Sequence, residues 1–284
     1  MLLFCLLLSG VSQAKEDVVA VLSSELQPYV VALQEFQNSF GKNVTTLHLA
    51  QQPFVLQGHP QVAVAFGGKA ALQHYPEETT LVYCMAPGTY LMPTDYKNVV
   101  IQVSMMPKPA SVLFKIKALQ PSIKHLAVLW SSPSFGSYVT LLQKIGKGAG
   151  IEILGARLEK PEGLPDRLRE WEGQADALLV TADPTLISDQ NTIVIAQFAW
   201  ANHTPFYAAI QGMADKGAAA SFSVSFSDIG RASSQAAKAA LSRKFVEPIF
   251  YADESETTIN VSAAAKAGLT IDPSTLRHHE KVIP

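Results

Sequence analysis

The feature that most constrains the fold is a strict alternation of short apolar runs and amphipathic segments along nearly the whole chain. Runs such as VVAVLSS (18–24) and QVAVAFG (61–67) are rich in β-branched residues and carry no polar alternation. Strands that are apolar at every position are buried on both faces, which is typical of parallel sheets covered by helices. The pattern therefore predicts an α/β protein built on parallel sheets.

The alternation runs through the chain twice. A first set of strands ends with NVVIQVS (98–104), and a second set begins with HLAVLWSS (125–132) after a helix predicted over 111–119. At 284 residues the chain is also long for a single hydrophobic core. We therefore expect two doubly wound lobes.

Composition excludes some classes of function. The chain has 24 acidic and 22 basic residues, a formal net charge of -2, and no basic cluster. Binding to nucleic acid or to an anionic membrane surface relies on a concentration of positive charge. We expect neither partner.

Residues 1–14, MLLFCLLLSGVSQA, form an apolar run that ends in small and polar residues, and a charged stretch follows from Lys15. The run is shorter than the roughly 20 residues that span a bilayer. Small residues at Ser12 and Ala14 complete the pattern of a signal peptide, which predicts export to the periplasm or another extracytoplasmic space. A buried first strand and a lipid anchor at Cys5 are weaker alternatives, the latter because the large Phe4 precedes the cysteine.

Removal of this leader leaves Cys84 as the single cysteine, so we expect no intramolecular disulfide. Cys84 lies in the apolar strand TTLVYCMAP (79–87), where a small buried hydrophobic role is expected rather than a nucleophilic one.

Motifs of common enzymes are absent from the sequence. There is no G-x-S-x-G elbow, Walker loop or H-E-x-x-H helix, and GKGAG (146–150) ends a predicted helix instead of following a strand. His278, His279 and Glu280 lie in a polar tail without a third metal ligand. We expect a protein that is not an enzyme and uses no metal or cofactor.

Ligands of doubly wound folds gather outside the carboxyl ends of the parallel strands. The candidate ligand-binding residues at these ends are Ser23, Ser24, Gly67, Gly68, Ser131, Ser132, Asp183, Tyr207 and Gln211. Small, hydroxyl-bearing residues with one carboxylate suit a small zwitterion or polar organic molecule. Ser131 and Ser132, with the helix that follows Pro133, are expected to bind a carboxylate. Candidate aromatic walls are Phe66, Trp130, Phe135 and Tyr207.

Three stretches carry a resemblance to a known family. They are ALQPSIKHLAVLWSSPSFGS (118–137), SFSVSFSDIGRASSQAAKAAL (221–241) and TTINVSAAAKAGLTIDPSTL (257–276). The chain resembles the substrate-binding proteins of ABC transporters with the type I periplasmic-binding fold, in the group related to aromatic amino acids. The likeness is weaker in the first hundred residues.

The resemblance implies two lobes joined by a three-strand hinge. The N-terminal lobe would comprise 15–104 and 222–246, and the C-terminal lobe 105–221 and 247–284. The segment ETTINV (256–261) would be the last crossing or the strand just beyond it.

The implied function is capture of a small amino-acid-like or aromatic molecule by a monomer that delivers it to the membrane permease of an ABC importer. Asp183 matches an aspartate of the family and would pair with an ammonium group. An alternative is a periplasmic sensing subunit that regulates a membrane-bound signalling protein. Two departures from the family favour it: residues 51–60 are too short and proline-interrupted for the family's helix, and Gly67-Gly68 lacks a hydroxyl.

Overall fold

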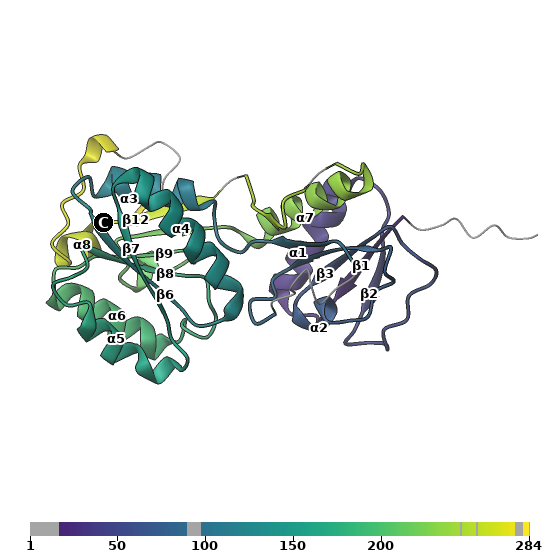
Figure 1. Ribbon diagram of the computed structural model, residues 1–284, viewed down its shortest axis with the longest axis horizontal. Coiled ribbons are helices and arrows are strands. Elements are labelled where there is room, and N and C mark those ends of the chain that lie inside the picture. The colour runs from purple at the N-terminus through teal and green to yellow at the C-terminus, as the bar shows by residue number, and fades with distance from the viewer. Residues whose placement is uncertain (1–16, 90–97, 245, 254, 276–280, 284) are drawn as a thin grey trace, which may run out of the picture.

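A computed structural model of the protein describes residues 17–89, 98–244, 246–253, 255–275 and 281–283. The predicted signal peptide and the His278–Glu280 tail lie outside these residues. The chain forms two lobes that lie end to end, each built on one sheet (Figure 1). The predicted fold class, α/β with two doubly wound parallel sheets, is confirmed.

The sheet of the first lobe has the strand order β11-β5-β4-β3-β1-β2. All of its pairings are parallel. The strands are β1 (Val18–Leu22), β2 (Thr45–His48), β3 (Val62–Phe66), β4 (Thr80–Cys84), β5 (Val100–Val103) and β11 (Ile249–Phe250). Helices α1 (Gln27–Phe40) and α7 (Phe226–Leu241) pack on one face, and the short helix α2 (Gly68–Ala71) lies on the other.

The sheet of the second lobe has the order β13-β12-β10-β9-β8-β6-β7. Its strands are β6 (His125–Trp130), β7 (Glu152–Arg157), β8 (Ala177–Val180), β9 (Phe206–Ala208), β10 (Ala220–Ser223), β12 (Glu256–Asn260) and β13 (Lys281–Ile283). Strand β12 runs antiparallel to β10, and the other pairings are parallel.

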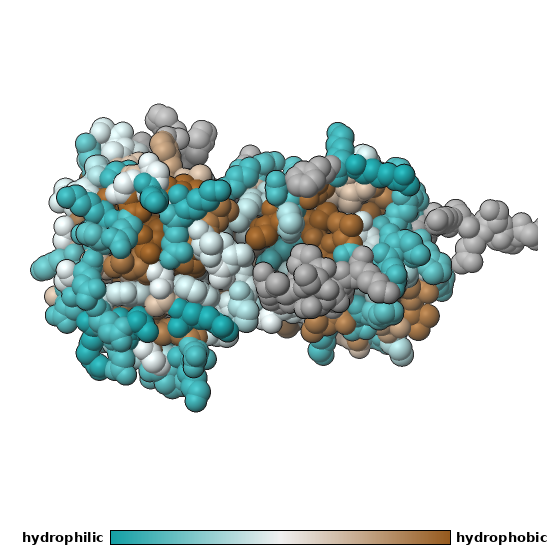
Figure 2. Space-filling view, viewed as in Figure 1, coloured by the Kyte–Doolittle hydropathy of each residue, from teal (hydrophilic) through white to brown (hydrophobic). Residues whose placement is uncertain are grey.

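Helices and 3-10 turns complete the second lobe. They are α3 (Pro109–Leu119), η1 (Pro133–Phe135), α4 (Gly136–Ala149), η2 (Pro161–Gly163), α5 (Leu164–Glu170), α6 (Asp189–Ala201), η3 (Ala214–Lys216), α8 (Val261–Lys266) and η4 (Pro273–Thr275). Hydrophobic clusters fill both faces of this sheet, as they do in the first lobe. Figure 2 shows hydrophilic side chains over much of the helical surface, with hydrophobic residues visible between them. Among the described residues, no helix combines the length and the apolar character needed to cross a membrane.

The chain crosses between the lobes three times. The crossings follow β5, β10 and β11, and they lead to α3, α7 and β12 respectively. Lys115 of α3 anchors the third crossing, because its Nζ donates to Ser255 Oγ at 2.9 Å and to Thr257 Oγ1 at 2.8 Å. Asp253 accepts from Lys108 at 3.0 Å and from Gln235 of α7 at 3.3 Å, so it links the crossings to both lobes.

The third crossing comes before ETTINV (256–261) in the chain. ETTINV is therefore the strand just beyond the crossing and not the crossing itself. Strand β12 is already part of the second sheet, whereas Ile249 and Phe250 pair with β5 in the first sheet. Thr257 is buried and faces Lys115, whereas Val261 opens α8 at the surface. Asn260 fixes the end of β12 to backbone: it caps α8 by accepting from Ala263 N at 2.8 Å and donates to Ala214 O at 2.8 Å.

Helix α1 has Leu26 as its N-cap residue, without a side-chain cap bond, so the candidate Ser24 takes no part in capping it. Residues 51–60 contain no helix, as the prolines predicted. Phe54 from this connection packs edge-on against Tyr75, with ring centroids 5.3 Å apart, and so helps to cover the sheet.

Candidate functional site

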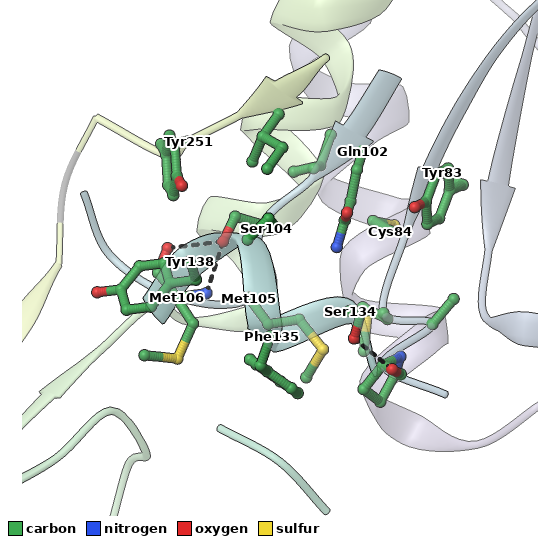
Figure 3. Close-up of a pocket in the computed structure, with 16 residues that line it drawn as sticks. Tyr83, Cys84, Gln102, Ser104, Met105, Met106, Ser134, Phe135, Tyr138 and Tyr251 are labelled. Atoms are coloured by element: carbon green, nitrogen blue, oxygen red, sulfur yellow. Dashed lines mark hydrogen bonds between the residues drawn. The ribbon is translucent and has the colours of Figure 1, made fainter. Parts of the chain in front are cut away.

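A small cavity lies where the two lobes and the third crossing meet (Figure 3). Its volume is about 20 Å³, which is room for roughly one water molecule. The first lobe contributes the carboxyl ends of β4 and β5, and the second lobe contributes η1 and the first turn of α4. The lining residues are Tyr83, Cys84, Met85, Ala86, Pro87, Gln102, Val103, Ser104, Met105, Met106, Ser134, Phe135, Ser137, Tyr138, Ile249 and Tyr251.

The lobes touch at the edge of this cavity. Ser134 Oγ of η1 donates a hydrogen bond to the backbone carbonyl of Pro87, which follows β4. Met105, on the first crossing, packs against the hydrophobic clusters of both lobes. The cavity is therefore bounded by groups that would separate if the hinge opened.

Three buried hydroxyl groups on the cavity wall have no hydrogen-bond partner in the described part of the chain. They belong to Ser137, Tyr138 and Tyr251. The rings of Tyr138 and Tyr251 lie on the same side of the cavity, with centroids 6.4 Å apart (Figure 3). Burial raises the pKa of Tyr251 to about 12 and the pKa of Tyr138 well above its ordinary value, so both are protonated. Buried hydroxyls are almost always paired in native proteins, which makes three orphans at one place a mark of a ligand or water site.

The rest of the lining is neutral. Among the described residues that line the cavity there is no Asp, Glu, Lys, Arg or His. Desolvation raises the pKa of Cys84 to about 12, so this thiol is protonated and behaves as the small buried group that the sequence predicted. Elsewhere in the described residues, no group of three or more His, Cys, Asp and Glu side chains is placed to hold a metal ion.

Asp183, expected to bind the ammonium group of a ligand, is hydrogen-bonded to Ser131 and Ser132, which were expected to bind the ligand's carboxylate. Asp183 is completely buried and its carboxylate accepts from Ser132 N at 2.5 Å, Ser131 N at 2.7 Å and Ser132 Oγ at 2.8 Å. It also accepts from the backbone and hydroxyl of Thr185 at 3.1 and 2.8 Å. The expected ammonium ligand and the expected carboxylate donors thus satisfy each other. Asp183 fixes the loop after β8 to the loop after β6.

Burial raises the pKa of the Asp183 carboxyl group, but the hydrogen bonds from Ser132 and Ser131 lower it more, so the net pKa lies below its ordinary value. The group stays ionised although it has no cationic partner in these hydrogen bonds.

The candidates of the first lobe meet at the carboxyl ends of the paired strands β1 and β3, where the strand order along the chain reverses direction across the sheet. Ser23 Oγ accepts from Ala70 N at 2.9 Å, so it supports helix α2. Gly67 has a φ of 94°, and a Cβ there would overlap Ser23 and Tyr29, so only glycine fits. Ser24 and Gly68 are half-buried beside them. These residues are placed at the edge that faces the second lobe but do not line the small cavity.

The remaining candidates are dispersed. Tyr207 is fully buried, stacks on Phe222 and donates to Gln120 Oε1 at 3.0 Å, so it is a core residue instead of a cleft wall. Gln211 is exposed and reaches Glu256 at 3.4 Å. Of the aromatic candidates, Phe135 lines the cavity, Phe66 packs in the first core, and Trp130 lies half-buried below α4.

Most residues that line the cavity are not among the candidates predicted from the carboxyl ends of the strands. Tyr138 and Tyr251 lie in a helix and on a crossing, where sequence gives no signal that separates a cleft residue from a core residue. The run SMMP at 104–107 was a usable signal, because polar and flexible apolar residues directly follow a buried strand.

Solved structures share this architecture from end to end. A conserved domain protein from Vibrio cholerae O1 biovar El Tor superposes with a TM-score of 0.62 at 17% identity, covering 95% of this chain and 100% of that one. A Streptococcus pneumonia ABC domain in complex with L-Trp gives 0.61 at 16%, covering 94% and 100%. A ligand-free, open substrate binding protein with adhesive properties from Clostridium difficile gives 0.61 at 14%, covering 94% and 99%. The fold is thus that of the type I periplasmic binding proteins.

A family model described as "ABC transporter substrate binding protein" matches residues 100–283. The chain belongs to this family, whose members bind ligands and are not enzymes. A search of curated proteins finds no match.

Proposed function

We propose that this is an exported solute-binding protein that captures a small molecule between its lobes and presents it to the permease of an ABC importer. The observation that carries the proposal is the cavity between the lobes, with three buried hydroxyls that no described residue satisfies. Groups from both lobes and from a crossing meet there, so a ligand that bonds to them favours the closed arrangement.

The cavity is too small for any organic ligand in its present form. Entry therefore requires the lobes to separate at the Ser134–Pro87 contact and to close again around the ligand. Ser24, Gly68 and Gln211 are the predicted site residues that are half-buried or exposed, and they are proposed to contact a ligand in a wider cleft. The proposed ligand is a small molecule, either amino-acid-like or aromatic.

The function is tested with purified mature protein and a panel of metabolites. A bound compound is expected to raise the melting temperature and to reduce the radius of gyration measured by small-angle X-ray scattering, because binding stabilises the closed form. A panel of amino acids, aromatic compounds and nucleobases that changes neither quantity contradicts the proposal.

A further inference from the structure

The cavity offers hydrogen bonds but no charge. Each of the orphan hydroxyls of Ser137, Tyr138 and Tyr251 can both donate and accept. The other serines of the lining are already engaged, since Ser104 bonds to the backbone of Met106 and Ser134 bonds to Pro87. Gln102 adds a neutral amide to the wall (Figure 3).

A charged ligand would find no counter-charge among the described lining residues. Asp183 is held by five hydrogen bonds from the serines and the threonine around it, and it lies outside the cavity wall. An ion transferred from water to a site without a partner loses its hydration energy without compensation. A carboxylate or ammonium group is therefore disfavoured here.

The apolar part of the lining indicates the shape of the ligand. Met85, Met105 and Met106 surround the cavity together with Phe135. Methionine sulfur and flexible methionine chains pack well on aromatic rings. A phenyl ring and methionine side chains beside neutral hydroxyls suit a flat ring that has polar atoms on its edge.

Resting on the proposed function, we propose that the site takes an uncharged aromatic or heteroaromatic compound with hydrogen-bond donors and acceptors on its edge, and not a zwitterionic amino acid. Of the two ligand kinds expected from the sequence, amino-acid-like or aromatic, the lining matches the second.

The test compares matched neutral and charged compounds by isothermal titration calorimetry. The pairs are nicotinamide and nicotinate, uracil and orotate, and indole-3-acetamide and indole-3-acetate, with L-tryptophan as the zwitterion. We expect at least one neutral member to bind at least ten-fold more tightly than its charged counterpart. Tighter binding of a charged member, or of tryptophan over indole-3-acetamide, overturns the neutral-ligand inference and leaves the solute-binding function standing. No binding by any of the compounds counts against both.

Hydroxyl deletions locate the interaction. Tyr138→Phe and Tyr251→Phe are expected to weaken binding of the preferred neutral compound by about ten-fold each, the loss of one hydrogen bond in a buried site. Tyr75→Phe is the matched control, because Tyr75 donates to Ala70 O at 2.7 Å in the first lobe, away from the cavity lining. Unchanged affinity in both cavity variants, or an equal loss in the control, overturns the inference.

Discussion

At the scale of single residues, Asp183 shows how a residue with the chemistry of a ligand site can serve the protein itself. Its carboxylate ties the loop after β6 to the loop after β8, at the edge of the sheet nearest to the first lobe. The backbone N–H groups of Ser131 and Ser132 both point inward at this acceptor. The shape of the second lobe's cleft edge therefore depends on Asp183.

Asp183→Asn is expected to lower the free energy of unfolding by about 2–4 kcal/mol, because a buried carboxylate that accepts several hydrogen bonds is replaced by a group with one acceptor and two donors. Chemical denaturation at pH 7 measures this loss. Asp189→Asn is the control: Asp189 is fully exposed and pairs with Lys216, so the midpoint should not change. Equal stability of Asp183→Asn and the wild type contradicts the role assigned to Asp183.

The pH dependence of the same comparison follows from the lowered pKa of Asp183. Because the pKa of Asp183 is lower in the folded state, its ionised form stabilises the folded protein at pH values above the unfolded-state pKa of about 4. This stability is lost as the pH falls through the folded-state pKa. The difference between wild type and Asp183→Asn should thus be constant from pH 5 to 8 and shrink below about pH 4. A difference that grows on acidification contradicts the assignment.

The sequence was informative about which residues stand at strand ends and uninformative about what they contact. Ser23, Gly67, Ser131 and Asp183 were all found from the end of an apolar run, and all lie at the carboxyl edges of their sheets. Their partners depend on loops that approach each other from distant parts of the chain. Tyr207 lies within β9 and not after its end, so its side chain packs in the core cluster on one face of the sheet.

At the scale of elements, the chain returns from the second lobe to the first through the crossing before α7, and α7 then packs on α1. Apolar side chains of both helices fill one core cluster over the sheet. Gly230 lies at their closest approach, since a Cβ there would overlap the carbonyl oxygen of Ala32 and crowd Phe36 N. The alternation in the sequence predicted both helices, but the need for glycine at 230 appears only when the two are side by side.

Gly230→Ala is expected to destabilise the protein by about 1–3 kcal/mol, because the helices must move apart to admit a methyl group. Gly148→Ala is the matched control in α4, where a Cβ meets nothing within 4 Å. There the same change should be neutral or stabilise by up to about 1 kcal/mol, through helix propensity alone. Thermal unfolding of both variants measures the contrast, and similar effects at the two sites contradict the close packing of α1 and α7.

At the scale of the whole molecule, the account rests on two rigid lobes and a hinge of three short crossings. The fold could be predicted from the rhythm of the strands, and the family from three stretches in the last two thirds of the chain. The exact position of the third crossing could not be predicted, because β11 is only two residues long and is positioned by its pairing with β5. The cavity formed by these crossings escaped prediction for the same reason.

Locking the lobes together should abolish binding. The Ser134–Pro87 contact is the place to link the lobes with a cysteine pair, Pro87→Cys with Ser134→Cys. Oxidation of this variant is expected to leave the radius of gyration unresponsive to indole-3-acetamide and to prevent its binding, and reduction should restore both. Ser134→Cys alone, oxidised in the same way, controls for reaction at Cys84. A cross-linked protein that binds as well as the reduced one contradicts entry through lobe opening.

The most direct measurement of the central claim is a crystal structure of the protein with the neutral compound that gives the largest thermal shift. The account predicts the compound between the lobes, with polar atoms within hydrogen-bond distance of the Tyr138 and Tyr251 hydroxyls and its ring against Met105, Met106 or Phe135. A compound found elsewhere, such as in the open groove lined by Lys124, Gln143 and Ile153 on the second lobe, would contradict it.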